Sequence, residues 1–110
     1  MTTKHPPCTL DSLTVHGLSL IGNRYGDPIE RAVPVILPPS YHREPSRRYP
    51  VVYVLASFTG AGYQLLNRSP IAEALDERIA RLLATDPSIP EFITVLPDCY
   101  TALGGSQYVN

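Results

Sequence analysis

The sequence predicts an α/β fold with about four strands, a parallel strand–helix–strand unit and at least one covering helix. Three observations predict this unit: a continuous apolar run at 51–55, an amphipathic stretch at 71–84 and a second β-branched apolar run at 92–98. Strands that alternate with a helix are typical of parallel sheets covered by helices. The chain has 110 residues and 44% hydrophobic content, which is room for one domain with a core.

Two further strands are predicted before this unit. Apolar and polar side chains alternate over residues 13–20, as in a half-buried strand. A turn rich in Gly, Asn, Asp and Pro follows at 22–28, and the apolar run 31–39 is the second strand. Pro34 lies inside that run and indicates an edge strand or a bulge, because proline has no N–H to donate.

The polar and basic segment 40–48 is predicted to be a solvated loop, although its arginines would also suit a phosphate or partner site. Residues 51–55 have no polar alternation, which is the pattern of a strand covered on both faces. We therefore expect this strand to be central and parallel.

Ser69 and Pro70 provide an N-cap and a first helical residue for a helix over 71–84. The apolar side chains expected to face the sheet are Ile71, Leu75, Ile79, Leu82 and Leu83. The side chains expected to face water are Glu73, Asp76, Glu77, Arg78 and Arg81, with Glu77 and Arg81 as an i,i+4 pair.

A crossover of this kind places the loops that follow its two strands at the same carboxyl edge of the sheet. Chemistry in such sheets is found at that edge. The residues of interest therefore lie in 56–64 and 98–110.

Charge and cysteine content exclude several classes. Nine Lys and Arg oppose ten Asp and Glu, which leaves no field to attract nucleic acid or an anionic membrane. We expect no secretory leader, because the opening MTTKHPP is polar and carries prolines, and no run of about 20 apolar residues is present. Cys8 and Cys99 are too few for a disulfide framework and suit a reducing compartment, so we expect a cytoplasmic protein.

Neither of two candidate serines has the glycines of a nucleophile elbow. Leu55 and Thr59 flank Ser57 at the places where glycine belongs, and Tyr108 occupies one such place beside Ser106. The histidines are expected in a tail, a strand and a polar loop, away from the carboxyl edge: His5, His16 and His42.

Gly60 and Gly62 invite comparison with a dinucleotide loop, but Leu65 stands where the third glycine belongs and no lysine follows. His5 and Cys8 are close in sequence, but no second pair of metal ligands has suitable spacing, so no metal and no cofactor are expected. The backbone amides of 57–60 remain: they could face a developing oxyanion, or they could form a plain turn.

Four segments carry a resemblance that covers most of residues 12–110: RAVPVILPPSY, RRYPVVYVLASFTG, LDERIARLL and EFITVLPDCYTALGGSQYVN. Together they resemble the amino-terminal part of an esterase family that includes esterase D-like enzymes and mycolyltransferases. This family has the α/β-hydrolase fold. The resemblance implies a polar tail at 1–11 and, at 12–110, an incomplete α/β-hydrolase domain that stops before the nucleophile elbow.

The resemblance also implies roles for particular residues. The Phe58 amide, with Thr59 beside it, matches the family's oxyanion-hole donor, although Ala56-Ser57 replaces the family's His-Gly or Ser-Gly. Residues expected to line the cleft are Ser57, Asp98, Tyr100, Gly104, Gly105 and Ser106. The serine, acid and histidine of the triad are expected beyond Asn110, so this chain alone is expected to be inactive.

The implied parent activity is hydrolysis or acyl transfer of a small carboxylic ester through a serine acyl-enzyme. The alternative is a noncatalytic α/β module that binds itself or a partner through an open sheet edge, expected at the strand 92–98. Neither reading involves nucleic acid or a membrane.

Overall fold

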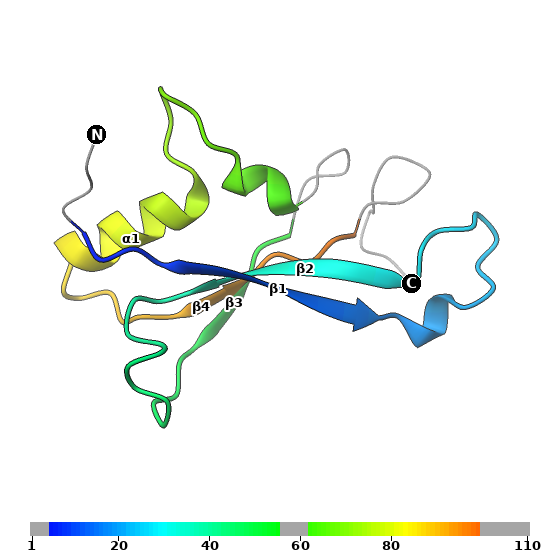
Figure 1. Ribbon diagram of the computed structural model, residues 1–110, viewed down its shortest axis with the longest axis horizontal. Coiled ribbons are helices and arrows are strands. Elements are labelled where there is room, and N and C mark those ends of the chain that lie inside the picture. Colours follow the sequence, from blue (N-terminus) through cyan, green and yellow to red (C-terminus); the bar gives the residue numbers. More distant parts are fainter. Residues whose placement is uncertain (1–4, 56–61, 100–110) are drawn as a thin grey trace.

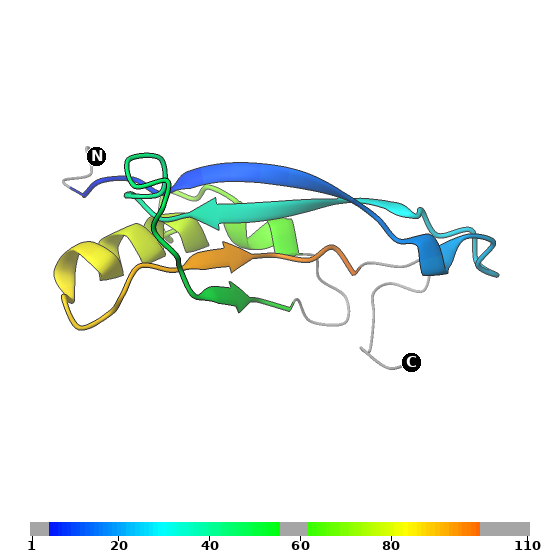
Figure 2. The same ribbon diagram turned by 90° about the horizontal axis from the view of Figure 1, so that it is seen from below.

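The computed structural model describes residues 5–55 and 62–99, which form a mixed four-stranded sheet with one α-helix (Figure 1). The strand order is β1-β2-β4-β3, and the four strands lie side by side in that order in Figure 2. The elements are β1 (Thr9–His16), β2 (Glu30–Leu37), β3 (Val51–Tyr53), α1 (Leu75–Thr85) and β4 (Ile93–Val95), with short 3₁₀ helices at Leu18–Leu20 and Gly62–Leu66.

The predicted strand–helix–strand unit is confirmed. β3 and β4 are parallel neighbours, with Val51 opposite Ile93 and Tyr53 opposite Val95, and α1 lies between them in the chain. Continuous β-branched runs therefore identified both strands of the parallel pair, and the amphipathic stretch identified the helix that connects them.

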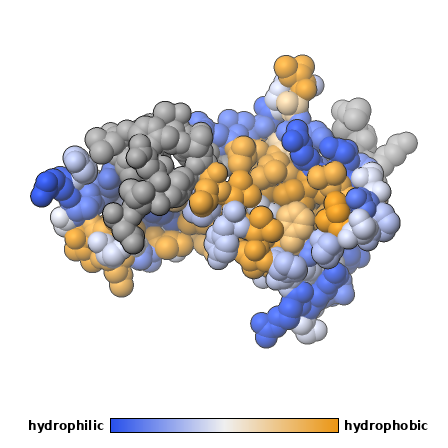
Figure 3. Space-filling view, turned by 180° about the vertical axis from the view of Figure 1, so that it is seen from behind, coloured by the Kyte–Doolittle hydropathy of each residue, from blue (hydrophilic) through white to orange (hydrophobic). Residues whose placement is uncertain are grey.

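The order of these strands corrects two expectations. β4 is not an open edge, because it lies between β2 and β3 and pairs antiparallel with β2 through Val35 and Val95. β3 is instead at the edge of the described sheet and is not covered on both faces, since Tyr53 is 65% exposed. Figure 3 shows the face opposite to that of Figure 1, and hydrophobic residues gather at its centre.

The first strand starts and ends earlier than predicted. β1 pairs with β2 over eight residues, from Thr9 opposite Leu37 to His16 opposite Glu30, so pairing begins inside the segment predicted as a tail. Residues 18–20 form a 3₁₀ turn instead of strand, because the Gly17 N–H donates to Ile29 O at 2.7 Å and closes the hairpin.

Pro34 lies in an interior strand, which contradicts its predicted edge position. The strand accommodates a proline here because the side of the backbone that lacks an N–H does not face β1. Its carbonyl accepts a hydrogen bond from Leu96 N at 3.0 Å, so its backbone groups face β4 and not β1. A narrow antiparallel pair would add a bond from N–H of residue 34 to O of residue 96, which proline cannot donate. The ladder between β2 and β4 accordingly has only the pairs Val35–Val95 and Ile36–Thr94.

The helix begins four residues later than predicted. Ser69 Oγ accepts from Ile71 N at 3.3 Å in a local turn, and Ile71 is 93% exposed instead of facing the sheet. Ala74 is the N-cap, and its N–H donates to Glu77 Oε1 at 2.9 Å. The Ser69 side chain therefore bonds within a local turn, and the residues predicted as the first turn of the helix are not helical.

Two polar predictions and one apolar prediction on the helix are also corrected. Asp76 is 7% exposed, not water-facing, because both of its oxygens bind Arg68 at 2.6 and 3.0 Å. Arg81 pairs with Glu73 at 3.0 Å and not with Glu77, which is engaged by Arg68 and Ala74. Leu82 is exposed.

The core lies between α1 and one face of the sheet, which also carries the 3₁₀ helix Gly62–Leu66 (Figure 1). Ile36, Ile79 and Leu96 are its buried centre. Partly buried neighbours complete it: Cys8, Val54, Leu66, Leu75, Leu83 and Phe92. Within the described residues, no helix combines the length and the apolar character needed to cross a bilayer.

Candidate functional site

The carboxyl ends of β3 and β4 point to one edge of the sheet, as expected from their parallel pairing. Val54 N donates to Val95 O at 2.9 Å, which continues the pairing one residue past β3. Leu55 and Asp98 therefore both lie beyond the carboxyl ends of this parallel pair. This edge is where an α/β sheet presents residues for chemistry.

β1 and β2 also contribute residues on this side. β2 runs antiparallel to β4, so its amino end, with Arg31, lies toward the carboxyl end of β4. β1 runs antiparallel to β2, so its carboxyl end with His16 lies on the same side, contrary to the expectation for this histidine. The His16 ring nitrogen Nδ1 is 3.4 Å from Glu30 Oε1, and both side chains are mostly exposed.

Of the predicted site residues, the structure describes only Asp98. The others lie outside the described residues: Ser57, Phe58, Thr59, Tyr100, Gly104, Gly105 and Ser106. Their predicted roles as oxyanion-hole donors or cleft-lining residues stay predictions.

Asp98 takes part in an ion pair at this edge. Its Oδ1 lies 3.6 Å from Arg31 Nη1, and the Arg31 side chain is only 11% exposed. Arg31 Nε also donates to Pro28 O at 3.0 Å, which orients the guanidinium. The pair connects the start of β2 to the chain that leaves β4, and thereby positions the beginning of the segment 98–110.

The sequence analysis missed Arg31. Its signal is a positive charge at the start of an otherwise apolar strand, where a side chain is expected to be half-buried. A guanidinium in that position needs an acidic or carbonyl partner. The register between β2 and β4, which the sequence does not reveal, decides that this partner is Asp98.

Cys8 is not a nucleophile for this edge. It packs against the core below α1, and burial, together with the negative charges of Asp76 and Glu91, raises its pKa from 9.0 to about 11. A thiol with such a pKa stays protonated near neutral pH. Within residues 5–55 and 62–99, no three His, Cys, Asp or Glu side chains are grouped to hold a metal ion.

No protein-family model and no curated protein sequence matches this chain. Solved structures do match its fold. One, a ferulic acid esterase, aligns with a TM-score of 0.66 and 22% identity over 94% of this chain and 33% of its own. Another, a CE1 ferulic acid esterase from Anaeromyces mucronatus in complex with ferulic acid, aligns with a TM-score of 0.64 and 23% identity over 100% of this chain and 34% of its own.

These alignments define the class of fold. The mixed sheet with its covering helix is a partial α/β fold, similar to part of the fold of these two esterases. More particularly, the chain spans about a third of the length of the ferulic acid esterases that it matches. At this level of identity the likeness is one of fold.

Proposed function

We propose that this chain is the amino-terminal part of a serine hydrolase or acyltransferase that acts on carboxylic esters. The observation that supports the proposal most directly is the parallel pairing of β3 with β4, connected through α1. This pairing puts the carboxyl ends of both strands at one edge of the sheet, where the proposal expects the cleft. The fold alignments with ferulic acid esterases support the same class of activity.

In this proposal the chain supplies part of the oxyanion hole. Phe58 and Thr59 follow β3 in the sequence, and their backbone amides would donate to the charge that develops on the substrate carbonyl oxygen. Preorganised donors of this kind contribute about 3–4 kcal/mol each to transition-state stabilisation. Asp98, held by Arg31, would border the cleft at the start of the second loop.

The triad would come from residues that follow Asn110. A serine in a G-x-S-x-G turn would attack the ester carbonyl, and a histidine oriented by an acid would take the serine proton. Both matched structures are named for ferulic acid esters, so feruloyl esters are the first substrates that we would test.

The reading frame beyond codon 110 and a fluorophosphonate probe for activated serines test the proposal together. The chain 1–110 should not react with the probe and should hydrolyse p-nitrophenyl acetate at no more than a trace rate. If the reading frame continues beyond codon 110, the probe should label the longer protein at the serine of a G-x-S-x-G motif. A robust rate from 1–110 that Ser57→Ala abolishes would overturn the proposal.

The oxyanion role has its own matched pair of variants in the longer protein. Phe58→Pro removes the backbone N–H and should lower kcat by about 10²- to 10³-fold. Phe58→Ala keeps the N–H and should leave most of kcat, with melting temperatures confirming that both variants fold. Equal losses in the two variants would assign the effect to the side chain and refute the amide's role.

A noncatalytic module remains the second candidate, because the outer edge of β3 has no partner strand among the described residues. Pro50 O and Val54 N bond to β4, so the backbone groups of Val51 and Tyr53 point the other way. Their side chains are uncharged and exposed, which favours pairing with another strand. A well-defined dimer with a sharp melting transition would support this candidate.

A further inference from the structure

A cavity of about 720 Å³ opens at the end of the sheet opposite to the candidate catalytic edge. It lies against the loop between β2 and β3, which extends below the sheet and away from α1 (Figure 1). The lining residues that matter for its chemistry are Tyr41, His42, Arg47, Arg48, Tyr49 and Ile93. Ile93 is the first residue of β4 and lines this cavity, whereas the proposed cleft follows the carboxyl ends of β3 and β4. This cavity is therefore separate from the proposed cleft.

The buried hydroxyl of Ser40 holds the lining residue Tyr49 in place. Ser40 is 2% exposed, which corrects its prediction as part of a solvated loop, although residues 41–48 are exposed as expected. Its Oγ donates to Glu91 Oε2 and accepts from the Tyr49 hydroxyl at 2.7 Å. These bonds join the loop to the segment that leads into β4 and fix the Tyr49 ring.

Arg47 is held against the same cluster. Its Nη1 lies 3.3 Å from Glu91 Oε2 and 3.2 Å from Glu44 Oε2, and its guanidinium carbon lies 5.1 Å from the centre of the Tyr49 ring. The two carboxylates thus compensate Arg47 through one nitrogen. Its Nε and Nη2 make no hydrogen bond within the described residues.

Arg48 is the cation that this network leaves uncompensated. It lines the cavity and forms no ion pair within the described residues. Tyr41 and Tyr49 line the same cavity, and their ring centres lie 6.0 Å apart with planes tilted by 34°. An uncompensated guanidinium binds an oxyanion, and tyrosine rings stack on planar rings.

The size of the cavity decides between a bare ion and an organic anion. Small-molecule sites have volumes of about 300–1,000 Å³, and this cavity falls within that range. An inorganic ion would fill only a small part of it and would not use the tyrosine rings. We propose that this cavity binds a small aromatic anion, a planar ring that carries a carboxylate or a phosphate, with Arg48 holding the anion and Tyr41 and Tyr49 the ring.

Binding is tested by titrating the isotope-labelled chain with four probes and following the amide signals of Tyr49 and Ile93. Benzoate and phenyl phosphate carry both ring and charge, and whichever binds more tightly identifies the anionic group. Inorganic phosphate lacks the ring and benzamide lacks the charge, so each should bind at least 10-fold more weakly than the better aromatic anion. Equal binding of inorganic phosphate would overturn the role of the rings, and equal binding of benzamide would overturn the role of Arg48.

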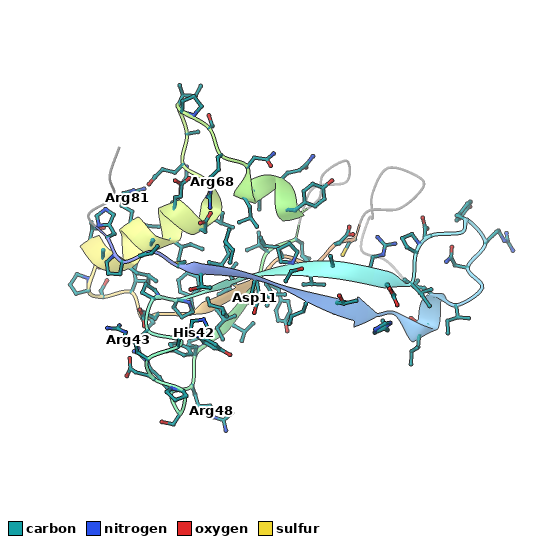
Figure 4. The ribbon with its side chains drawn as sticks, in the orientation of Figure 1. Asp11, His42, Arg43, Arg48, Arg68 and Arg81 are labelled. Atoms are coloured by element: carbon teal, nitrogen blue, oxygen red, sulfur yellow. The ribbon has the colours of Figure 1, made fainter. Side chains whose placement is uncertain are left out.

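Matched arginine variants separate a site from general positive charge. The side chains of Arg43 and Arg48 point in different directions from the same loop, and Arg43 does not line the cavity (Figure 4). Arg48→Gln should weaken binding of the aromatic anion about 10-fold, whereas Arg43→Gln should leave it unchanged. Glu44→Gln should strengthen binding, because it removes a negative charge from the lining. Similar weakening by both arginine variants would refute the site.

Discussion

Arg31 and Asp98 form an ion pair between the amino end of β2 and the chain that leaves β4, with 3.6 Å between Nη1 and Oδ1. The two residues are brought together by antiparallel pairing between β2 and β4. A contact so distant in sequence thus fixes the first residue of the segment in which the resemblance places part of the cleft.

Replacing Arg31 should destabilise the fold. We expect Arg31→Met to lower the free energy of unfolding by about 1–2 kcal/mol, less than for a fully buried pair, because water can solvate the remaining carboxylate. Urea unfolding measures this change. A double-mutant cycle with Asp98→Asn should give a coupling energy above about 0.5 kcal/mol, and additive effects would show that the pair contributes nothing.

Two arginine pairs near α1 should differ in their contribution to stability (Figure 4). Arg68 holds the buried carboxylate of Asp76 with two nitrogens, whereas Arg81 holds the exposed carboxylate of Glu73. Arg68→Gln should cost about 1–2 kcal/mol, a value reduced by the exposure of Arg68 itself. Arg81→Gln should leave the urea midpoint unchanged, and equal midpoints for both variants would contradict the importance of burial.

Cys8 should react slowly with alkylating reagents. At pH 8 a thiol with a pKa of about 11 has roughly 100-fold less thiolate than one with a pKa of 9.0. A Cys99→Ser variant leaves Cys8 as the sole thiol, and mass spectrometry compares its alkylation rate in the folded chain and in denaturant. An equal rate in both conditions would contradict the raised pKa.

The same shift predicts a pH dependence of stability. The unfolded thiol releases its proton near pH 9 and the folded thiol near pH 11, so stability from Cys8 should fall as pH rises through this window. Cys8→Ala should remove this part of the decrease. Parallel stability curves for the two proteins between pH 8 and 11 would argue against it.

The open edge of β3 should promote association at high concentration. Tyr53→Lys places a charge on this edge at an exposed position, so it should reduce larger species in size-exclusion chromatography without unfolding the chain. Tyr63→Lys is the control, because Tyr63 is 57% exposed but lies outside β3. Loss of association in both variants would point to general charge repulsion, and a monomeric parent chain would refute edge pairing.

The parallel pair and its helix could be predicted because their signals are local. Residues 51–55 and 92–98 have continuous β-branched runs, and 71–84 has a helical period. The order of the strands could not be predicted in this way. The exposed β3 and the interior β4 have similar compositions, and only the pairing of β4 with β2 distinguishes their places.

The remaining differences also come from long-range or competing contacts. Asp76 can be buried because Arg68 binds its carboxylate. The helix begins after the turn at Ser69, although the local spacing of apolar residues favoured an earlier start. For the candidate site, the parallel pairing of β3 with β4 was predicted from the sequence, whereas the partner of Asp98 depended on the register of β2.

The ladder between β2 and β4 ends next to Pro34, which has no backbone N–H. With an N–H at position 34, β2 and β4 could form one further hydrogen-bonded pair beyond Val35 and Val95. The described ladder ends at this level, where Leu96 N donates to Pro34 O, while β1 and β2 continue their pairing as far as His16 and Glu30. Pro34 thus marks the level at which the described sheet narrows from four strands to two.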